Sequence, residues 1–97
     1  MPEIDPFSAY NERITPIVVQ SFTQTGALFN INLVIPNTQV AAFEALDKAN
    51  IPLVAAWVRA GVKLQLDFYT FCRNKGAGYV PTVEEIETIL ATFNPTV

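Results

Sequence analysis

The chain has 97 residues, of which 51% are hydrophobic and only 15% charged, and its six basic and nine acidic residues give a net charge of −3. A chain of this length forms one domain with one modest core, and its few scattered basic residues exclude the phosphate-neutralising surface that nucleic-acid binding requires. The charged fraction is well below the roughly 25% that is typical of soluble domains, so part of the apolar surface lacks polar cover.

The residue types that build common catalytic and metal sites are scarce. The chain has no His and a single Cys, Cys72, so zinc sites, Ser-His-Asp triads and Cys-His pairs cannot be assembled from it. We therefore predict no metal, no cofactor and no catalytic residues. One Cys permits no internal disulfide, and neither a signal-peptide pattern nor a membrane-spanning apolar run of roughly 18 residues is found. These features predict a cytoplasmic protein that does not enter membranes.

Residues 1–13 are expected to form an N-terminal arm, and residues 14–97 a single domain. Within the arm, Asp5-Pro6 suits the start of a short helical turn, because Asp accepts from free N–H groups and Pro fits the first helical position. Phe7 and Tyr10 could cover an apolar surface; the alternative is a frayed terminus.

A hairpin followed by a helix is predicted over residues 14–50. Residues 16–22 are rich in β-branched and aromatic side chains, residues 23–26 favour a turn, and residues 27–35 alternate between apolar and polar. Pro36-Asn37-Thr38 ends the second strand and offers a helix N-cap, after which apolar residues recur at helical spacing as far as Asn50.

Residues 51–75 allow two interpretations. Apolar residues recur three and four apart, as one long helix requires, but residues 62–68 also alternate strictly, as a strand requires. Gly61 suits a hairpin loop and is unfavourable inside a helix. The first interpretation gives a hairpin plus a long helix at 51–75, and the second gives another hairpin.

Internal similarity favours the second hairpin. Pro16-Ile17-Val18 matches Pro52-Leu53-Val54 at an offset of 36, and Gly26 matches Gly61 at an offset of 35. A second helix is then predicted from Thr82 to Asn94, because Thr82-Val83-Glu84-Glu85 fits a capping box and an apolar stripe follows it. The halves 14–50 and 51–97 thus read as an internal repeat of two ββα units.

The predicted fold is an α+β, ββα-ββα pseudo-duplicate. Two helices would pack on one face of a four-stranded antiparallel or mixed sheet. Right-handed connections would place the second and fourth strands side by side at the centre, which corresponds topologically to a permuted ferredoxin-like sandwich.

Two places could bind a ligand. The first is the open face of the predicted central strands, where amides and one carboxylate would hydrogen-bond a small polar ligand or a second sheet; its residues are Asn30, Asn32, Lys63, Gln65, Asp67 and Tyr69. A plain solvated face is the alternative. The second is the loop that enlarges the second unit, with Arg73, Lys75, Gly76, Gly78 and Tyr79 before a helix N-terminus. It resembles an anion-binding arrangement only loosely, because it lacks a phosphate-binding motif.

The predicted function is a small non-catalytic protein-interaction module that self-associates, with a dimer as the expected homo-oligomer. Low charge favours pairing through an edge strand or the open sheet face. So do apolar residues that are expected outside the core, such as Val18, Phe22, Leu28, Val34, Val54, Val58 and Phe71. The alternatives are a ligand-binding domain or small enzyme that uses the open face or the 70–79 loop, and a structural subunit of a larger assembly.

Overall fold

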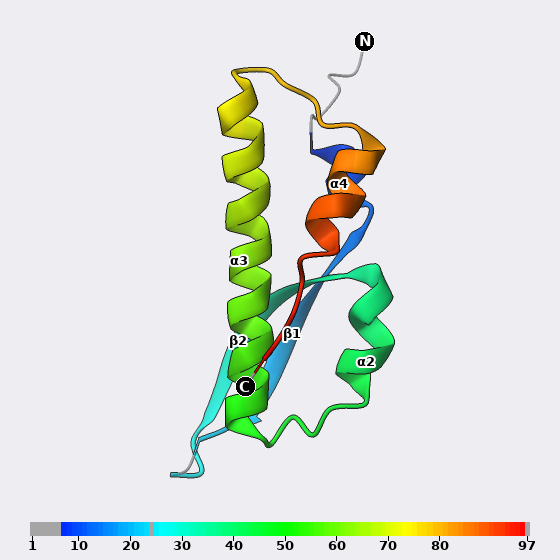
Figure 1. Ribbon diagram of the computed structural model, residues 1–97. Coiled ribbons are helices and arrows are strands. Elements are labelled where there is room, and N and C mark those ends of the chain that lie inside the picture. The colour runs from blue at the N-terminus through cyan, green and yellow to red at the C-terminus, as the bar shows by residue number, and fades with distance from the viewer. Residues whose placement is uncertain (1–6, 24, 97) are drawn as a thin grey trace.

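The computed structural model describes residues 7–23 and 25–96. It shows a two-stranded antiparallel sheet behind one long helix, with short helices beside them (Figure 1). The elements are, in order, α1 (Ser8–Asn11), β1 (Ile14–Phe22), β2 (Leu28–Pro36), the 3₁₀ helix η1 (Asn37–Gln39), α2 (Val40–Glu44), α3 (Ile51–Lys75) and α4 (Val83–Leu90). The predicted α+β class is correct at this coarse level.

The first predicted hairpin is confirmed. β1 pairs antiparallel with β2 over the full length of both strands, with Ile14 opposite Pro36 and Phe22 opposite Leu28. Side chains alternate between the two faces of the sheet. Odd-numbered residues such as Val19 and Leu33 face the core, and most of the even-numbered residues face solvent.

The prediction of a second hairpin is wrong, because residues 51–75 form the single helix α3. The Asn50 side chain caps its first turn by accepting from the N–H of Leu53 at 3.3 Å, and Pro52 lies in the first turn, where no N–H is needed. The helix ends at Gly76, whose φ of 115° is unfavourable for other residues. The apolar residues at helical spacing decide the outcome, and those on the buried side are Val54, Trp57, Ala60, Leu64, Phe68 and Cys72.

The ββα-ββα duplication and its four-stranded sheet are therefore absent from the described residues, where the sheet has only β1 and β2. The predicted permuted ferredoxin-like arrangement is therefore also wrong, since it requires a second pair of strands that the described residues do not form. The match between Pro16 and Pro52 does not reflect a repeat, because proline is tolerated at both places for its own reason. Pro16 lies in a strand and Pro52 in the first turn of a helix, and neither place requires a backbone N–H.

The two shorter helices differ in how well they were predicted. The helix expected as far as Asn50 is reduced to η1 and the five residues of α2. By contrast, the capping box of α4 is confirmed: Thr82 accepts from the N–H of Glu85, and the Glu85 carboxylate accepts from the N–H of Thr82 at 2.9 Å. Helix α4 ends at Leu90, earlier than the predicted Asn94.

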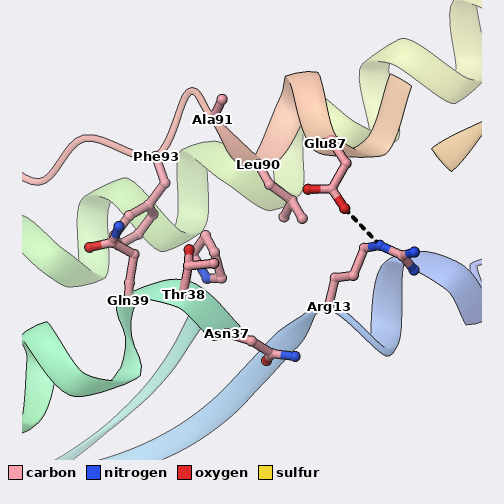
Figure 2. A pocket seen from close by; sticks show the side chains of 9 residues that line it. Arg13, Asn37, Thr38, Gln39, Glu87, Leu90, Ala91 and Phe93 are labelled. Atoms are coloured by element: carbon pink, nitrogen blue, oxygen red, sulfur yellow. Dashed lines mark hydrogen bonds and ion pairs between the residues drawn. The ribbon is translucent and has the colours of Figure 1, made fainter. Parts of the chain in front are cut away.

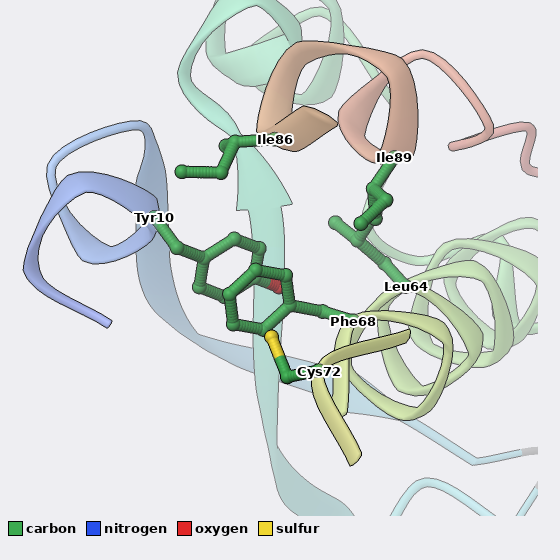
Figure 3. Packing of buried hydrophobic residues seen from close by; sticks show 6 residues of the cluster. All are labelled: Tyr10, Leu64, Phe68, Cys72, Ile86 and Ile89. Carbon is green, nitrogen blue, oxygen red and sulfur yellow. The ribbon is translucent and has the colours of Figure 1, made fainter. Parts of the chain in front are cut away.

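Helix α3 carries both halves of the hydrophobic core. One cluster joins its first half to the sheet and α2 through Val19, Leu33, Ile35, Phe43, Val54 and Trp57. The other joins its second half to α1 and α4 through Tyr10, Leu64, Phe68, Cys72, Ile86 and Ile89 (Figure 3). In this second cluster the Tyr10 ring stacks on Phe68 with 3.9 Å between centroids. The cap predicted at Asp5-Pro6 lies outside the described residues.

Candidate functional site

The residues of the first predicted binding face lie on two different elements. Asn30 and Asn32 are exposed on β2, on the sheet face that points away from the core. The other four belong to α3. Side chains two residues apart share a face in a strand but point in different directions in a helix. No common sheet face gathers these six side chains, because the second pair of strands is absent from the described residues.

The α3 members of that set separate further. Lys63 and Asp67 form an ion pair at 2.5 Å on the exposed side of the helix, where such i,i+4 pairs add a few tenths of a kcal/mol. Gln65 and Tyr69 instead line a small cavity of about 130 Å³ with Tyr10 of α1. The structure therefore divides the first set into three pairs, namely Asn30 with Asn32, Lys63 with Asp67, and Gln65 with Tyr69. Tyr69 also borders a hollow that Arg73 and Tyr79 line.

The loop residues are brought closer together. Arg73, Gly76, Gly78 and Tyr79 border a shallow hollow of about 300 Å³. Lys75 lies outside that lining, with its ammonium 5.8 Å from the centroid of the Tyr79 ring. Gly76 and Gly78 have φ of 115° and 79°, so both turns depend on glycine.

The adjoining N-terminus of α4 is already satisfied by its own side chains. The Tyr79 hydroxyl donates to the Glu85 carboxylate at 2.5 Å, and the same carboxylate accepts from the N–H of Thr82. These bonds, with the backbone bond first in effect, lower the pKa of Glu85, and the hydrogen bond to Glu85 raises the pKa of Tyr79. A carboxylate thus occupies the place that an external anion would take.

Cys72 is buried at 8% exposure beside this loop. Burial, and then the negative charge of Glu85, raise the pKa of its thiol. Arg73 and Lys75, which follow Cys72 in the sequence, therefore do not produce an activated thiolate, since that would require a lowered pKa and access to solvent.

A cleft that sequence reasoning missed lies where the start of β1, the end of β2 and α4 meet (Figure 2). Its volume is about 310 Å³. Arg13 donates to Glu87 across it at 2.9 Å and to the carbonyl oxygen of Ala9 at 2.7 Å. Leu90 and Phe93 supply apolar surface. These residues are far apart in the sequence and follow no motif, so no local signal could identify them.

The guanidinium of Arg13 is already paired with protein acceptors, and Figure 2 shows its terminal nitrogens turned away from the residues across the cleft. The lining carries one positive and one negative side chain that neutralise each other. This cleft therefore has no unbalanced charge with which to select a charged ligand.

The outer face of the hairpin is the most unusual surface of the chain. Residues 14–43 contain no Asp, Glu, Lys or Arg. Within this segment Val18, Phe22 and Leu28 are 66%, 52% and 61% exposed, and Phe22 lies directly opposite Leu28. Gln20, Asn30 and Asn32 provide amides on the same face, so the surface combines apolar side chains with groups that both donate and accept hydrogen bonds.

The structure gives no sign of a metal centre or a membrane span within the described residues. They contain no cluster of three or more metal-ligating side chains, and none of their helices is both long enough and apolar enough to cross a bilayer. Comparison with known proteins adds no relative, since no protein-family model, curated protein or solved structure matches the chain.

Proposed function

We propose that the protein is a small non-catalytic interaction module that self-associates through the outer face of its hairpin, with a second copy of the same chain as the occupant. The observation that carries this proposal is the uncharged outer face of the hairpin, where Val18, Phe22 and Leu28 are exposed, and the total exposed area is consistent with it. The chain exposes 6482 Å², whereas a compact monomer of 10.7 kDa exposes about 5,500 Å². The excess of about 1,000 Å² is close to the roughly 800 Å² that each partner buries in a standard interface.

The shape of the molecule supports this reasoning. The radius of gyration is 15.2 Å, and the principal extents are 49, 28 and 22 Å. A compact domain of this length has a radius of gyration of about 12.5 Å. The elongation arises because α3 and the hairpin lie side by side as a thin layer pair, with α3 and the core on one side of the sheet only (Figure 1).

A second copy suits this face chemically. The face has no charges, so two copies meet without like-charge repulsion. The amides of Gln20, Asn30 and Asn32 can bond to the same groups on the other copy, because each amide has both donors and acceptors. Two sheets packed face to face lie about 10 Å apart, a distance that side chains of the size of Phe22 and Leu28 fill from both sides. A reducing compartment, the cytoplasm, is the proposed location, since Cys72 needs no partner there.

The test compares the mass of the wild-type protein by light scattering with that of two lysine variants. Phe22→Lys places a charge on the proposed interface, whereas Val62→Lys places the same charge on α3 at an equal starting exposure of 52%. We expect twice the monomer mass for the wild type and Val62→Lys, and the monomer mass for Phe22→Lys. A monomeric wild type at millimolar concentration, or an equal loss with Val62→Lys, would refute the proposal. Thermal melts of both variants are the control for folding, and each variant should give a cooperative unfolding transition.

A further inference from the structure

The two edges of the hairpin differ in how they are covered. At the β2 edge, Gly61 of α3 lies directly against the backbone of Val34. At the β1 edge, a groove of about 340 Å³ separates the strand from α2. The groove is lined by Thr15, Ile17, Val18, Val19, Val40, Phe43, Glu44 and Lys48.

On the groove side, the β1 backbone carries hydrogen-bonding groups that pair with no other backbone group among the described residues. The Asn37 N–H donates to Arg13 O at 2.9 Å, and the Thr23 N–H donates to Ala27 O at 3.0 Å, at the two ends of the ladder. Bonded and non-bonded pairs alternate along an antiparallel ladder. Odd-numbered residues of β1 therefore bond to β2, and the N–H groups of Val18, Gln20 and Phe22 point outward along the free edge.

Pro16 fits the same alternation, because it occupies an outward position. Its missing N–H therefore costs no hydrogen bond between β1 and β2. It also limits the free edge. The part of β1 that can donate to a further strand begins at Val18, which is beside the groove.

We propose that an extended, uncharged segment of a partner protein adds to the free edge of β1 as a third strand. Evenly spaced backbone donors and acceptors are matched by another extended backbone, which is the basis of strand addition. Alternate side chains of the added strand point to the core side of the sheet, where the apolar groove between β1 and α2 receives them.

Charge selects the chemistry of this segment. The Lys48 ammonium is held within the chain, since it donates to the backbone carbonyl oxygen of Glu44 at 2.9 Å and lies 4.8 Å from the centre of the Phe43 ring. A charged side chain that entered among the apolar lining residues Ile17, Val40 and Phe43 would lose its hydration. Apolar side chains at alternate positions avoid this cost.

A second copy of the chain does not supply such a segment. Its own strands direct their core-facing side chains, including Val19, Leu33 and Ile35, into its own core, where they are at most 4% exposed. Pairing through its β1 edge would leave the groove unfilled. The added strand is therefore assigned to a different protein, and the groove shares only Val18 with the outer face proposed for self-association.

The test uses a synthetic peptide with the sequence of residues 28–36, acetylated and extended by two lysines for solubility. These nine residues are uncharged, form a strand in the protein, and are apolar except for Asn30 and Asn32. With saturating peptide we expect hydrogen exchange at the amides of Val18, Gln20 and Phe22 to slow at least tenfold. The same peptide N-methylated at four consecutive central residues should have no effect, because it lacks the donors. Unchanged exchange at millimolar peptide would overturn the proposal.

Matched proline variants locate the binding edge. Gln20 and Asn30 are directly opposite each other. Gln20→Pro removes an N–H that points outward from the free edge of β1, and Asn30→Pro removes one that points outward from the edge of β2. We expect Gln20→Pro to weaken peptide binding at least tenfold and Asn30→Pro to leave it unchanged. Val40→Lys, which fills the groove without altering a strand, should match Gln20→Pro and replaces it if that variant does not fold.

The outcomes separate this inference from self-association. Phe22→Lys leaves the β1 backbone intact, so it should lose the dimer and still bind the peptide. Equal weakening by Asn30→Pro, or peptide-induced shifts confined to the side chains of the outer face, would overturn the third-strand site. Because Gln20 also lies on the outer face, Val40→Lys tests the occupant of the edge: loss of the dimer in that variant would assign the edge to a second copy and overturn the proposal of a different partner.

Discussion

Gly61 of α3 and the carbonyl oxygen of Val34 in β2 are in such close contact that a Cβ atom on residue 61 would lie 2.5 Å from that oxygen. The same Cβ atom would lie 3.1 Å from the side chain of Leu33. The absence of a side chain at residue 61 therefore sets how closely the long helix approaches the hairpin. Through this contact, α3 covers the β2 edge at Val34, while the β1 edge stays open.

The first prediction concerns this contact. Gly61→Ala should gain about 1 kcal/mol from helix propensity but lose more through overlap with a backbone atom that cannot rotate away. We expect a net loss of about 2 kcal/mol in the free energy of unfolding, as for other overpacked cores, measured by urea denaturation. Val62→Ala, at the exposed neighbouring position, should change it by less than about 0.5 kcal/mol. A stabilised Gly61→Ala protein would show that helix and sheet do not approach this closely.

The same glycine explains which part of the fold could be read from the sequence. Gly61 followed by the alternating residues 62–68 is typical of a hairpin, and the glycine is in fact required by packing between elements distant in the sequence. In the helix, Leu64 and Phe68 are buried and Leu66 is exposed, so four-residue spacing accounts for residues that also fit a two-residue period. Local pattern could not separate these periods, because the deciding contact is tertiary.

The features that were predicted correctly depend on local chemistry. The capping box of Thr82 and Glu85 involves residues three apart, and the β1–β2 hairpin joins neighbouring segments across a short turn. Of the apolar residues expected outside the core, Val18, Phe22 and Leu28 are exposed, whereas the expectation is wrong for Val54, which is fully buried in α3. The position of α2 beside β1, and with it the groove, depends on the course of the chain after β2, which no residue pattern specifies.

The second prediction concerns Tyr10. Its side chain is buried at 4% exposure, and its hydroxyl bonds to no other group in the part of the chain that the structure describes. An unpaired buried hydroxyl costs about 1 to 3 kcal/mol. Tyr10→Phe keeps the stacking on Phe68 and removes the hydroxyl, so we expect it to stabilise the protein by about 1 kcal/mol in urea denaturation. Destabilisation would mean that the hydroxyl has a partner, such as an ordered water.

The ionisation of Tyr10 gives an independent measurement. Burial, and then the neighbouring Tyr69, raise the pKa of Tyr10 to about 12. A raised pKa means that folding favours the neutral form, so this contribution to stability is complete below the ordinary value of about 10 and is lost as the pH rises towards 12. Absorbance at 295 nm should show one tyrosine that titrates last, and this step should be missing in Tyr10→Phe.

The third prediction concerns the reactivity of Cys72. Because the thiol is buried in the cluster around Phe68 (Figure 3) and its pKa is raised, iodoacetamide should alkylate the folded protein at least 100-fold more slowly than the urea-unfolded chain at pH 8. Mass spectrometry over time measures both rates. Alkylation of the folded protein at the rate of the unfolded chain would indicate that the loop after α3 opens readily and exposes this cluster.

The fourth prediction concerns the acid dependence of the α4 cap. The backbone N–H of Thr82 and then the Tyr79 hydroxyl lower the pKa of Glu85. A lowered pKa means that the carboxylate stabilises the fold above its ordinary value, and that this stabilisation is lost as the pH falls through the folded value. In urea denaturation at pH 6, 5, 4 and 3, the wild type should be more stable than Glu85→Gln at pH 6, and the difference should shrink towards pH 3.

Two further variants serve as controls. Glu84→Gln alters a carboxylate outside the capping box in the same turn, so its stability difference should depend less on pH. Thr82→Ala should lower the free energy of unfolding by about 1 kcal/mol at pH 6. A constant difference between wild type and Glu85→Gln across this range would show that the charge of Glu85 does not hold the cap.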